Sequence, residues 1–377
     1  MSNSATINTR VRFVRRVTLS VVIMLCSAIA LNIAQHRWGR YPVPPPDHTA
    51  PTVQHGLHVV GAHLLDETGT PVFLTGISLS GTEYICEPRQ LPQVQPEQMR
   101  IMETWGIDTI RLPLSAPYWL NTDGRCPHYR EAIKSIVASA ENQGMTVILE
   151  LQWCAPLSDP NGGGQYAMPD RAEAVPFWSS VASDYASDGH ALFELYSEPH
   201  DIDWNTWLNG GHITVAADAA KHLLAGSYDA IGMQEMTQII NARSPSRVAL
   251  VSGMQWATDL SEVPFGLWID GWNIAYAIHP YDAPTMRKAD QWPLLFGDVA
   301  AQRPVIATEF GQLDCGHDQL DRLLPYLAKH TQGMIAWTWI VGDCHRPSIL
   351  ADWYGTPSAY GAPIAAFFSQ RSNHATP

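Results

Sequence analysis

The sequence predicts a single (β/α)8 barrel, the TIM-barrel architecture of the α/β class, and three observations support this prediction. Eight short apolar runs alternate with longer segments, most of which have the periodicity of amphipathic helices. The runs are almost continuously apolar, as expected for parallel strands that are buried on both faces. No glycine-rich dinucleotide-binding motif follows the first run, which disfavours a doubly wound open sheet. We therefore expect one closed barrel over residues 57–370.

The expected elements follow one another along that domain. The predicted barrel strands are Phe73–Leu79, Thr109–Leu112, Val147–Leu151, Ala191–Tyr196, Val248–Ser252, Asn273–Ile278, Val305–Glu309 and Met334–Trp339. The clearest predicted helices are Pro96–Trp105, Tyr129–Gln143, Phe177–Ala186 and Met233–Ala242. Before the barrel, Leu57–Val60 and Val72–Leu74 flank Asp66–Thr70, whose acidic and glycine residues favour a tight reversal. This pattern predicts an N-terminal β-hairpin.

Residues 1–40 differ in composition from the rest of the chain. Four arginines precede the mainly apolar run Val17–Ala34, and no acidic residue occurs before Asp47. This order is typical of an export signal, and the run is also at the short limit for a membrane span. A cleaved signal peptide and a retained membrane anchor both remain open. Either one predicts that the domain is secreted, or membrane-anchored and extracytoplasmic.

The segments that flank the predicted domain have simpler interpretations. Residues 41–56 are rich in proline, which predicts a semi-rigid linker. Residues 371–377 are expected to form a flexible tail.

Charge and aromatic content restrict the class of ligand. The net charge of −13 disfavours nucleic acid as a partner, because no basic surface is available to bind phosphates. It is compatible with a neutral ligand such as a glycan. The 14 Trp and 13 Tyr supply flat rings for sugar stacking, although most of them are expected in the core. The histidines have no metal-ligand spacing, so we expect no metal and no cofactor, and we expect a monomer.

The cysteines predict disulfides in an exported protein. Cys315 and Cys344 follow the seventh and eighth predicted strands, whose loops are neighbours in a barrel, and are expected to be bonded. Among the three other cysteines outside the N-terminal apolar run, one further bridge is expected. The first choice is Cys86 with Cys126, which leaves Cys154 as a free thiol.

Polar residues follow several predicted strands where these strands end. In an α/β barrel the carboxyl ends of the strands meet on one face, where the chemistry is carried out. Glu198 follows the fourth strand and Glu309 ends the seventh. Two facing carboxyl groups suit glycoside hydrolysis, one as acid/base and the other as nucleophile or base. The other polar or aromatic residues expected on this face are Arg111, Gln152, Ser197, His279, Tyr281 and Trp339.

The same segments carry a family resemblance. Ser197-Glu198-Pro199-His200 resembles the Asn-Glu-Pro motif of clan A glycoside hydrolases, and Ala307–Gly311 resembles their nucleophile strand. Further matching segments are Leu74–Ile77, Ser80–Tyr84, Gly106–Pro113, Met168–Asp170, His279–Tyr281, Trp337–Trp339 and Asp352–Pro357. Together they make the stretch from Leu57 to Phe367 resemble glycoside hydrolase family 5, the cellulase family.

The resemblance implies roles for these residues. Glu198 would be the acid/base and Glu309 the nucleophile of a retaining mechanism. Arg111 and the Tyr281 hydroxyl would support the negative charge of Glu309, and His279 would help to set the protonation states.

The resemblance also implies a sugar platform. Trp339 would form the floor of the sugar subsite next to the scissile bond. Trp337, two residues earlier on the same predicted strand, is the rival for that role. Trp153, Trp204, Trp207 and Trp256 follow other strands and are either further sugar platforms or core residues.

Two positions depart from the family pattern. Ser197 replaces the asparagine that precedes the acid/base, and Gln152 replaces a histidine on the third strand. Both replacements keep the catalytic carboxyl groups, so we expect them to change rate and substrate preference and not the type of reaction.

The leading hypothesis is therefore an exported retaining endo-β-1,4-glucanase. A β-mannan or another β-glucan is the alternative substrate. A glycan-binding protein without activity is the alternative of a different class.

Overall fold

The computed structural model describes residues 40–46, 56–156, 164–218 and 223–374. The chain divides into two compact units, residues 1–43 and 44–377, and the second contains all the helices and strands discussed below. The predicted signal or anchor segment Val17–Ala34 lies outside the described residues. Within the described ranges, no helix is both long enough and apolar enough to cross a membrane. Residues 40–46 have no regular secondary structure.

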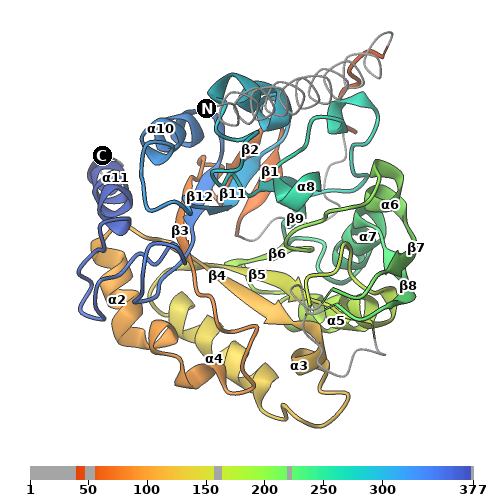
Figure 1. Cartoon of the computed structure of the whole chain (residues 1–377), viewed down its shortest axis with the longest axis horizontal. Helices are drawn as coiled ribbons and strands as arrows, with labels where there is room; N and C mark the ends of the chain where they lie inside the picture. The colour runs from red at the N-terminus through yellow and green to blue at the C-terminus, as the bar shows by residue number, and fades with distance from the viewer. Residues whose placement is uncertain (1–39, 47–55, 157–163, 219–222, 375–377) are drawn as a thin grey trace, which may run out of the picture. The chain divides into compact units, whose positions relative to one another are not determined.

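The predicted barrel is confirmed. Eight strands form a closed barrel (Figure 1), in which β3 pairs with β4 and the ring continues through β5, β6, β9, β10, β11 and β12 back to β3. All neighbouring pairs are parallel. The strands are β3 Leu74–Ser78, β4 Thr109–Ser115, β5 Thr146–Trp153, β6 Ala191–Glu194, β9 Ala249–Ser252, β10 Ile274–Ile278, β11 Val305–Phe310 and β12 Gly333–Ala336.

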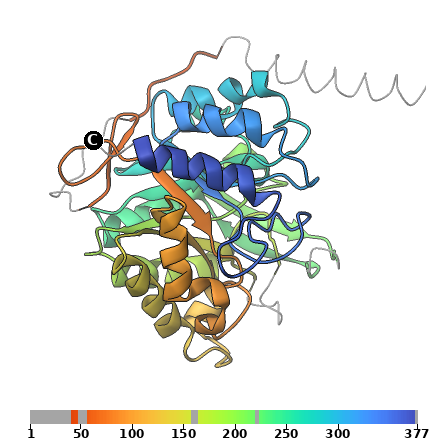
Figure 2. The ribbon, with the colours of Figure 1, turned by 90° about the vertical axis from the view of Figure 1, so that its left-hand side faces the viewer.

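Helices cover the outside of the barrel, and Figure 2 shows α2 and α11 lying across it. In α10 the buried residues recur at helical spacing (Leu320, Leu323, Leu324 and Leu327), so one apolar stripe faces the sheet. The helices are α2 Pro96–Thr104, α3 Ala116–Leu120, α4 Tyr129–Glu141, α5 Arg171–Asp184, α6 Trp204–Asn209, α7 Met233–Arg243, α8 Met254–Ala257, α9 Asp298–Ala300, α10 Leu320–His330 and α11 Gly361–His374. The last helix therefore includes four residues of the predicted flexible tail.

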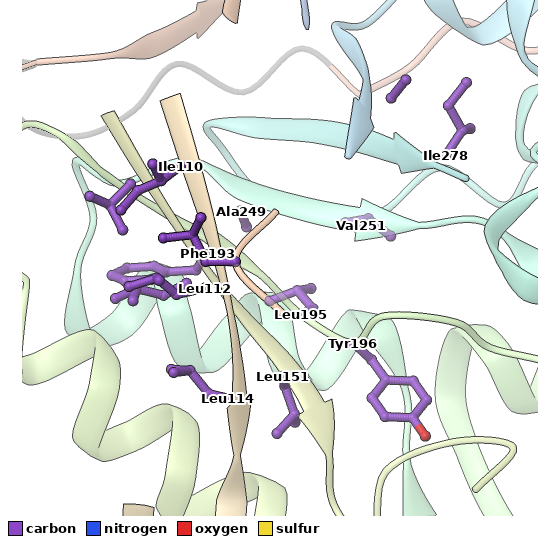
Figure 3. Packing of buried hydrophobic residues seen from close by; sticks show 14 of the residues in the cluster. Ile110, Leu112, Leu114, Leu151, Phe193, Leu195, Tyr196, Ala249, Val251 and Ile278 are labelled. Atoms are coloured by element: carbon purple, nitrogen blue, oxygen red, sulfur yellow. The ribbon is translucent and has the colours of Figure 1, made fainter. Parts of the chain in front are cut away.

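Alternation along the strands separates two apolar layers. One layer lies between strands and helices and includes Ile110, Leu112, Phe193 and Val251, all drawn in Figure 3. The other layer fills the interior of the barrel. Its members are Leu57, Leu64, Leu74, Ile148, Leu192, Val248, Leu250, Ala275, Ala277, Ile306 and Ile335.

The N-terminal hairpin exists, but its second strand and its turn differ from the prediction. Strand β1 (His58–Val60) pairs with β2 (His63–Leu65), and not with Val72–Leu74. The predicted reversal at Asp66–Thr70 follows β2, where the Asp66 carboxylate accepts from the backbone amides of residues 68 and 70. Alternation alone did not reveal the earlier turn. The hairpin contributes Leu57 and Leu64 to the interior layer and so closes the amino-terminal end of the barrel.

A second hairpin, β7 (Gly210–Val215) with β8 (Gly226–Ile231), lies between β6 and α7 and was not predicted. The predicted disulfides are confirmed: Cys86 is bonded to Cys126, and Cys315 to Cys344. Cys154 is a free, buried cysteine, as expected.

Candidate active site

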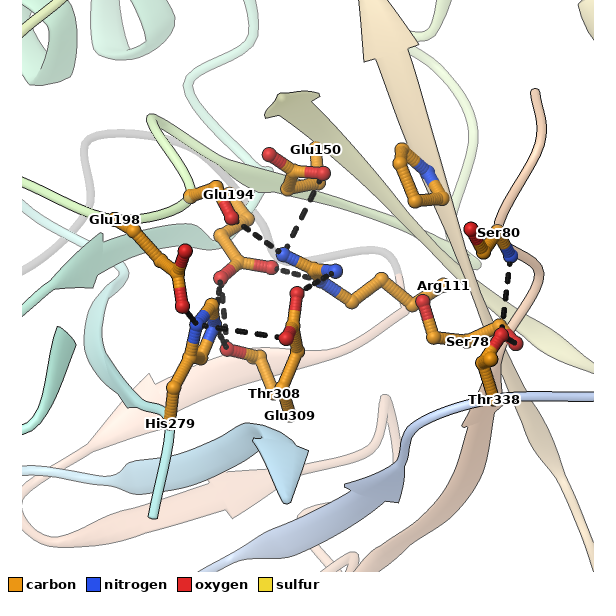
Figure 4. A network of polar contacts seen from close by, with 12 residues as sticks. Ser78, Ser80, Arg111, Glu150, Glu194, Glu198, His279, Thr308, Glu309 and Thr338 are labelled. Atoms are coloured by element: carbon orange, nitrogen blue, oxygen red, sulfur yellow. Dashed lines mark hydrogen bonds and ion pairs between the residues drawn. The ribbon is translucent and has the colours of Figure 1, made fainter. Parts of the chain in front are cut away.

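A polar layer lies above the apolar interior of the barrel, towards the carboxyl ends of the strands (Figure 4). On several strands the inward face changes from apolar to polar along the chain. On β5, for example, Ile148 belongs to the interior cluster, and Glu150 and Gln152 follow at alternate positions. The same alternation places Leu192 and then Glu194 on the inward face of β6. Rigid strands therefore hold the polar groups.

Arg111 is the centre of this layer and is fully buried. Its Nε donates to Glu194 at 2.6 Å, and one terminal nitrogen donates to Glu309 at 2.7 Å. The other terminal nitrogen lies 3.4 Å from the Ser197 hydroxyl and 3.4 Å from a Glu150 oxygen. The planar guanidinium thus fixes the relative positions of groups from β4, β5, β6 and β11.

An irregularity in β11 brings two consecutive side chains into the polar layer. The register between β11 and β12 shifts between Ala307 and Phe310. Thr308 donates to Glu194 at 2.7 Å, and Glu309 accepts from the Tyr281 hydroxyl at 2.7 Å. Strict alternation would turn one of these neighbours outward, and a bulge removes that constraint.

Glu198 lies in the loop directly after β6 and is the more accessible of the two predicted catalytic carboxyl groups. Its side chain is 17% exposed, and that of Glu309 is 7% exposed. One Glu198 oxygen lies 3.1 Å from His279 Nδ1, and the other accepts from Gln165 Nε2. One oxygen of Glu198, one of Glu309 and a ring nitrogen of His279 all lie within 4.8 Å of one another.

His279 contacts several carboxyl groups at once. Its Nε2 lies 3.3 Å from Glu194 and 3.1 Å from the Thr308 hydroxyl, while Nδ1 lies 3.8 Å from Glu309. Burial alone would lower the pKa of His279, but the carboxylates of Glu309, Glu194 and Glu198 outweigh it and raise the pKa to about 10. The imidazole is therefore a cation at neutral pH.

The buried carboxyl groups differ in their protonation. Burial favours the neutral form of Glu194, but Arg111 and His279 outweigh it and lower its pKa to about 2. Burial raises the pKa of Glu150 well above its ordinary value, against the attraction of Arg111. Burial also raises the pKa of Glu309, while His279, Arg111 and the Tyr281 hydroxyl act in the opposite direction. Glu194 is thus ionised at neutral pH, whereas burial favours the neutral form of Glu150.

The structure brings six of the predicted site residues into one connected cluster: Arg111, Ser197, Glu198, His279, Tyr281 and Glu309. Gln152 lies at the end of β5 on the same inward face. Its side-chain oxygen is buried and has no hydrogen-bond partner among the described residues.

The expectation for Trp339 is wrong. Its ring is fully buried, packs edge-on against Trp105, and donates its Nε1 hydrogen to Gln98 on α2. Strand β12 ends at Ala336, so the two tryptophans that follow do not share one face. Trp337 is partly exposed and comes directly after the strand, at the next inward position after Ile335, so it replaces Trp339 as the candidate sugar platform.

The other aromatic candidates divide into core and surface residues. Trp207 is fully buried and donates to the Ser252 carbonyl, so it belongs to the core. Trp256 is partly exposed, stacks on His200 with ring centroids 3.7 Å apart, and its amide donates to the Pro199 carbonyl. It therefore lies beside the loop that carries the acid/base candidate.

Three residues of the cluster were not predicted as parts of the site: Glu194, Thr308 and Gln165. For Glu194, the inward position two residues after Leu192 was a usable signal. For Thr308 the bulge hides the signal, and for Gln165 the sequence contains none.

Comparisons with known proteins give a family model and several relatives that this chain resembles. The family model described as cellulase (glycosyl hydrolase family 5) matches residues 65–343. The chain is 28% identical over 270 residues to endoglucanase A of Butyrivibrio fibrisolvens. The aligned region covers 70% of this chain and 53% of that protein. It is 25% identical over 284 residues to endoglucanase CelA of Streptomyces lividans, covering 73% of this chain and 52% of that protein. The chain thus spans about half the length of these curated relatives.

Solved structures share the fold. The β-glucanase SdGluc5_26A of Saccharophagus degradans, in complex with cellotetraose, has a TM-score of 0.65 at 23% identity, covering 90% of this chain and 99% of that one. The catalytic domain of Thermobifida fusca endoglucanase Cel5A has a TM-score of 0.62 at 19% identity, covering 83% and 96%.

Proposed function

Because the chain belongs to glycosyl hydrolase family 5, a family of glycoside hydrolases, we propose that it is a retaining endo-β-1,4-glucanase that acts by double displacement. The observation that carries this proposal is the spacing of Glu198 and Glu309. Their nearest carboxyl oxygens lie within 4.8 Å of each other. Retaining glycosidases hold the two carboxyl groups about 5–5.5 Å apart, whereas inverting enzymes separate them by about 6.5–9.5 Å to admit a water molecule.

In the first step, a Glu309 oxygen attacks the anomeric carbon and the bond from that carbon to the leaving glycosidic oxygen breaks. Glu198 gives its proton to the departing oxygen. Arg111 and Tyr281 each donate to one oxygen of Glu309, which orients the nucleophile and favours its ionised form.

In the second step, Glu198 acts as a base. It takes a proton from a water molecule, whose oxygen attacks the anomeric carbon, and the bond to Glu309 breaks. The imidazolium of His279 lies 3.1 Å from Glu198 and stabilises the carboxylate that this step requires. The two inversions leave the product with the β configuration of the substrate.

Three observations favour a β-glucan as the substrate. Curated relatives over most of this chain are named endoglucanases, and a structural neighbour was solved with cellotetraose. The net charge of −13 suits a neutral polymer. Trp337 offers a partly exposed ring at the end of β12 for stacking against a sugar.

The test uses 2,4-dinitrophenyl β-cellobioside with wild type, Glu309→Ala and Glu198→Ala. We expect wild type to release dinitrophenol and Glu309→Ala to be inactive, with azide restoring turnover and giving the α-glycosyl azide. Azide with Glu198→Ala should instead give the β-glycosyl azide, because the nucleophile is still present. A wild type that binds cello-oligosaccharides but is as inert as Glu309→Ala would support a glycan-binding protein. Carboxymethyl cellulose, β-mannan and xylan, with sizing of the products, test the substrate and endo action.

We also propose that the domain is exported, secreted or held by its N-terminal segment. The arginines before Val17–Ala34 and the two disulfides support this proposal. Fractionation of cells that express the full chain should find the protein outside the cytoplasm. Recovery of the folded protein in the cytoplasm, with the disulfide cysteines reduced, would contradict it.

A further inference from the structure

Gln165 touches the proposed acid/base directly. It lies in the loop between β5 and α5, is partly buried, and its Nε2 donates a hydrogen bond to Glu198 Oε2. The other Glu198 oxygen faces His279, so each carboxyl oxygen has its own partner. A carboxyl group held at both oxygens has a defined plane, which proton transfer to a glycosidic oxygen requires.

The loop around Gln165 is fixed to the elements that surround the acid/base. Three hydrogen bonds hold it: from the Tyr196 hydroxyl to the Tyr166 carbonyl, from the Tyr228 hydroxyl to the Met168 carbonyl at 2.7 Å, and from the His200 amide to the Ala167 carbonyl at 3.2 Å. Tyr196 and His200 stand on either side of Glu198 in the sequence. The backbone that carries Gln165 is thus hydrogen-bonded to the segment after β6 that carries Glu198, and this places the Gln165 side chain against Glu198.

Gln165 is the member of the groups around this carboxyl that does not titrate. The titratable groups that face Glu198 are His279 and Tyr281 from the segment after β10, Glu309 from β11, and Tyr196 and His200 from its own segment. A carboxamide neither gains nor loses charge with pH. It offers N–H groups to a carboxylate and a carbonyl oxygen to a protonated acid, so it can hold both forms of its partner.

We propose that Gln165 is a positioning residue that holds the Glu198 carboxyl in the orientation needed for acid catalysis in the first step and base catalysis in the second. This inference rests on the proposed function. A glycosidic bond breaks with little help from an acid when its leaving group is a stable anion, as dinitrophenolate is. Gln165 should therefore affect the rate of the first step with cellotetraose and hardly affect that with 2,4-dinitrophenyl β-cellobioside.

The experiment compares wild type with Gln165→Met, which keeps the side-chain volume and removes both hydrogen-bonding functions. We expect kcat/KM for cellotetraose to fall by about ten- to a hundredfold, and that for the dinitrophenyl substrate to change by less than about threefold. The matched control is Gln143→Met just after α4, where the side-chain amide contacts Met99 and Ser139 away from the site. It should leave both values unchanged.

Gln165→Glu supplies a second, independent readout. It places a new carboxyl group against Glu198, and two carboxyl groups at hydrogen-bonding distance retain a shared proton to higher pH. The alkaline limb of the profile of kcat/KM against pH should therefore move upward by about half a pH unit or more. A structural role would lower activity without moving this limb. Thermal unfolding midpoints identify a variant that fails to fold. If only one variant folds, it still tests the proposal, Gln165→Met through the two substrates and Gln165→Glu through the alkaline limb.

The outcomes separate the two proposals. Equal losses on both substrates for Gln165→Met, or an unmoved alkaline limb for Gln165→Glu, would overturn the role of Gln165 while an active wild type leaves the proposed function standing. A wild type that hydrolyses neither substrate would overturn the proposed function and the role of Gln165 together.

Discussion

The hydrogen bond from Tyr281 to Glu309 gives a quantitative test of how this site supports its nucleophile. The tyrosine is partly buried and its hydroxyl lies 2.7 Å from a Glu309 oxygen. Tyr281→Phe removes this donor and keeps the ring. A hydrogen bond to a charged group contributes about 1.5–3 kcal/mol, which corresponds to a fall in kcat/KM of about 10- to 150-fold if the bond acts in the transition state.

The same substitution should change the pH dependence with a defined sign. Burial raises the pKa of Glu309, and the Tyr281 hydroxyl acts against this rise. Without that donor the pKa rises further, so Glu309 is protonated, and inactive as a nucleophile, up to a higher pH. The acidic limb of the profile of kcat/KM against pH therefore moves upward in Tyr281→Phe.

The assay is the rate of dinitrophenol release from 2,4-dinitrophenyl β-cellobioside across the pH range. The matched control is Tyr276→Phe on β10, where the hydroxyl accepts from the Ile269 amide at 3.1 Å on the helix-facing side of the barrel. That change should lower stability by about 1 kcal/mol and leave the pH profile in place. Wild-type activity and an unmoved acidic limb in Tyr281→Phe would show that this hydrogen bond does not support the nucleophile.

Three further predictions concern the platform, the disulfide and the buried ion pair. Trp337→Ala should raise KM for cellotetraose about threefold to tenfold, because stacking against the sugar is lost. Trp339→Phe should leave KM unchanged and lower the free energy of unfolding, because the buried hydrogen bond to Gln98 is lost. Steady-state kinetics and urea unfolding measure the two quantities. Reduction of Cys315–Cys344, which spans 29 residues, or its replacement by serines should cost about 3 kcal/mol in the same unfolding assay. Because the pKa of Glu194 is lowered to about 2, the ionised side chain should stabilise the folded protein relative to Glu194→Gln. This difference in the free energy of unfolding should be complete above about pH 5 and should disappear as the pH falls towards about 2. A difference that does not change with pH would contradict this.

The sequence was sufficient for the barrel and for the two central carboxyl groups. Apolar runs such as Val305–Glu309 report burial on both faces, and the residues that end them fall at the carboxyl ends of the strands. Glu309 follows from this pattern because it lies in β11, whereas Glu198 lies in the loop after β6 and was identified with the help of the motif that it shares with the family. The Cys315–Cys344 bridge was predictable for the same reason, since consecutive strands of a barrel are neighbours.

The sequence did not predict the residues at which strands end or the paths that loops take. The position at which β12 stops decides that Trp339 turns into the helix layer, and the apolar pattern continues past that point. The bulge at Thr308 and Glu309 breaks the alternation from which inward residues are predicted. The contact of Gln165 with Glu198 depends on the path of a loop that is fixed by hydrogen bonds to other segments, and no local pattern encodes these bonds.

If Glu309 and Glu198 act as nucleophile and acid/base, as we propose, hydrolysis retains the configuration at the anomeric carbon. Proton NMR of cellotetraose hydrolysis, recorded before the product anomers equilibrate, tests it most directly. We expect the new reducing end to appear first as the β anomer, and we expect Glu309→Ala to form no product. Initial appearance of the α anomer would show a single displacement and contradict the roles assigned to both glutamates.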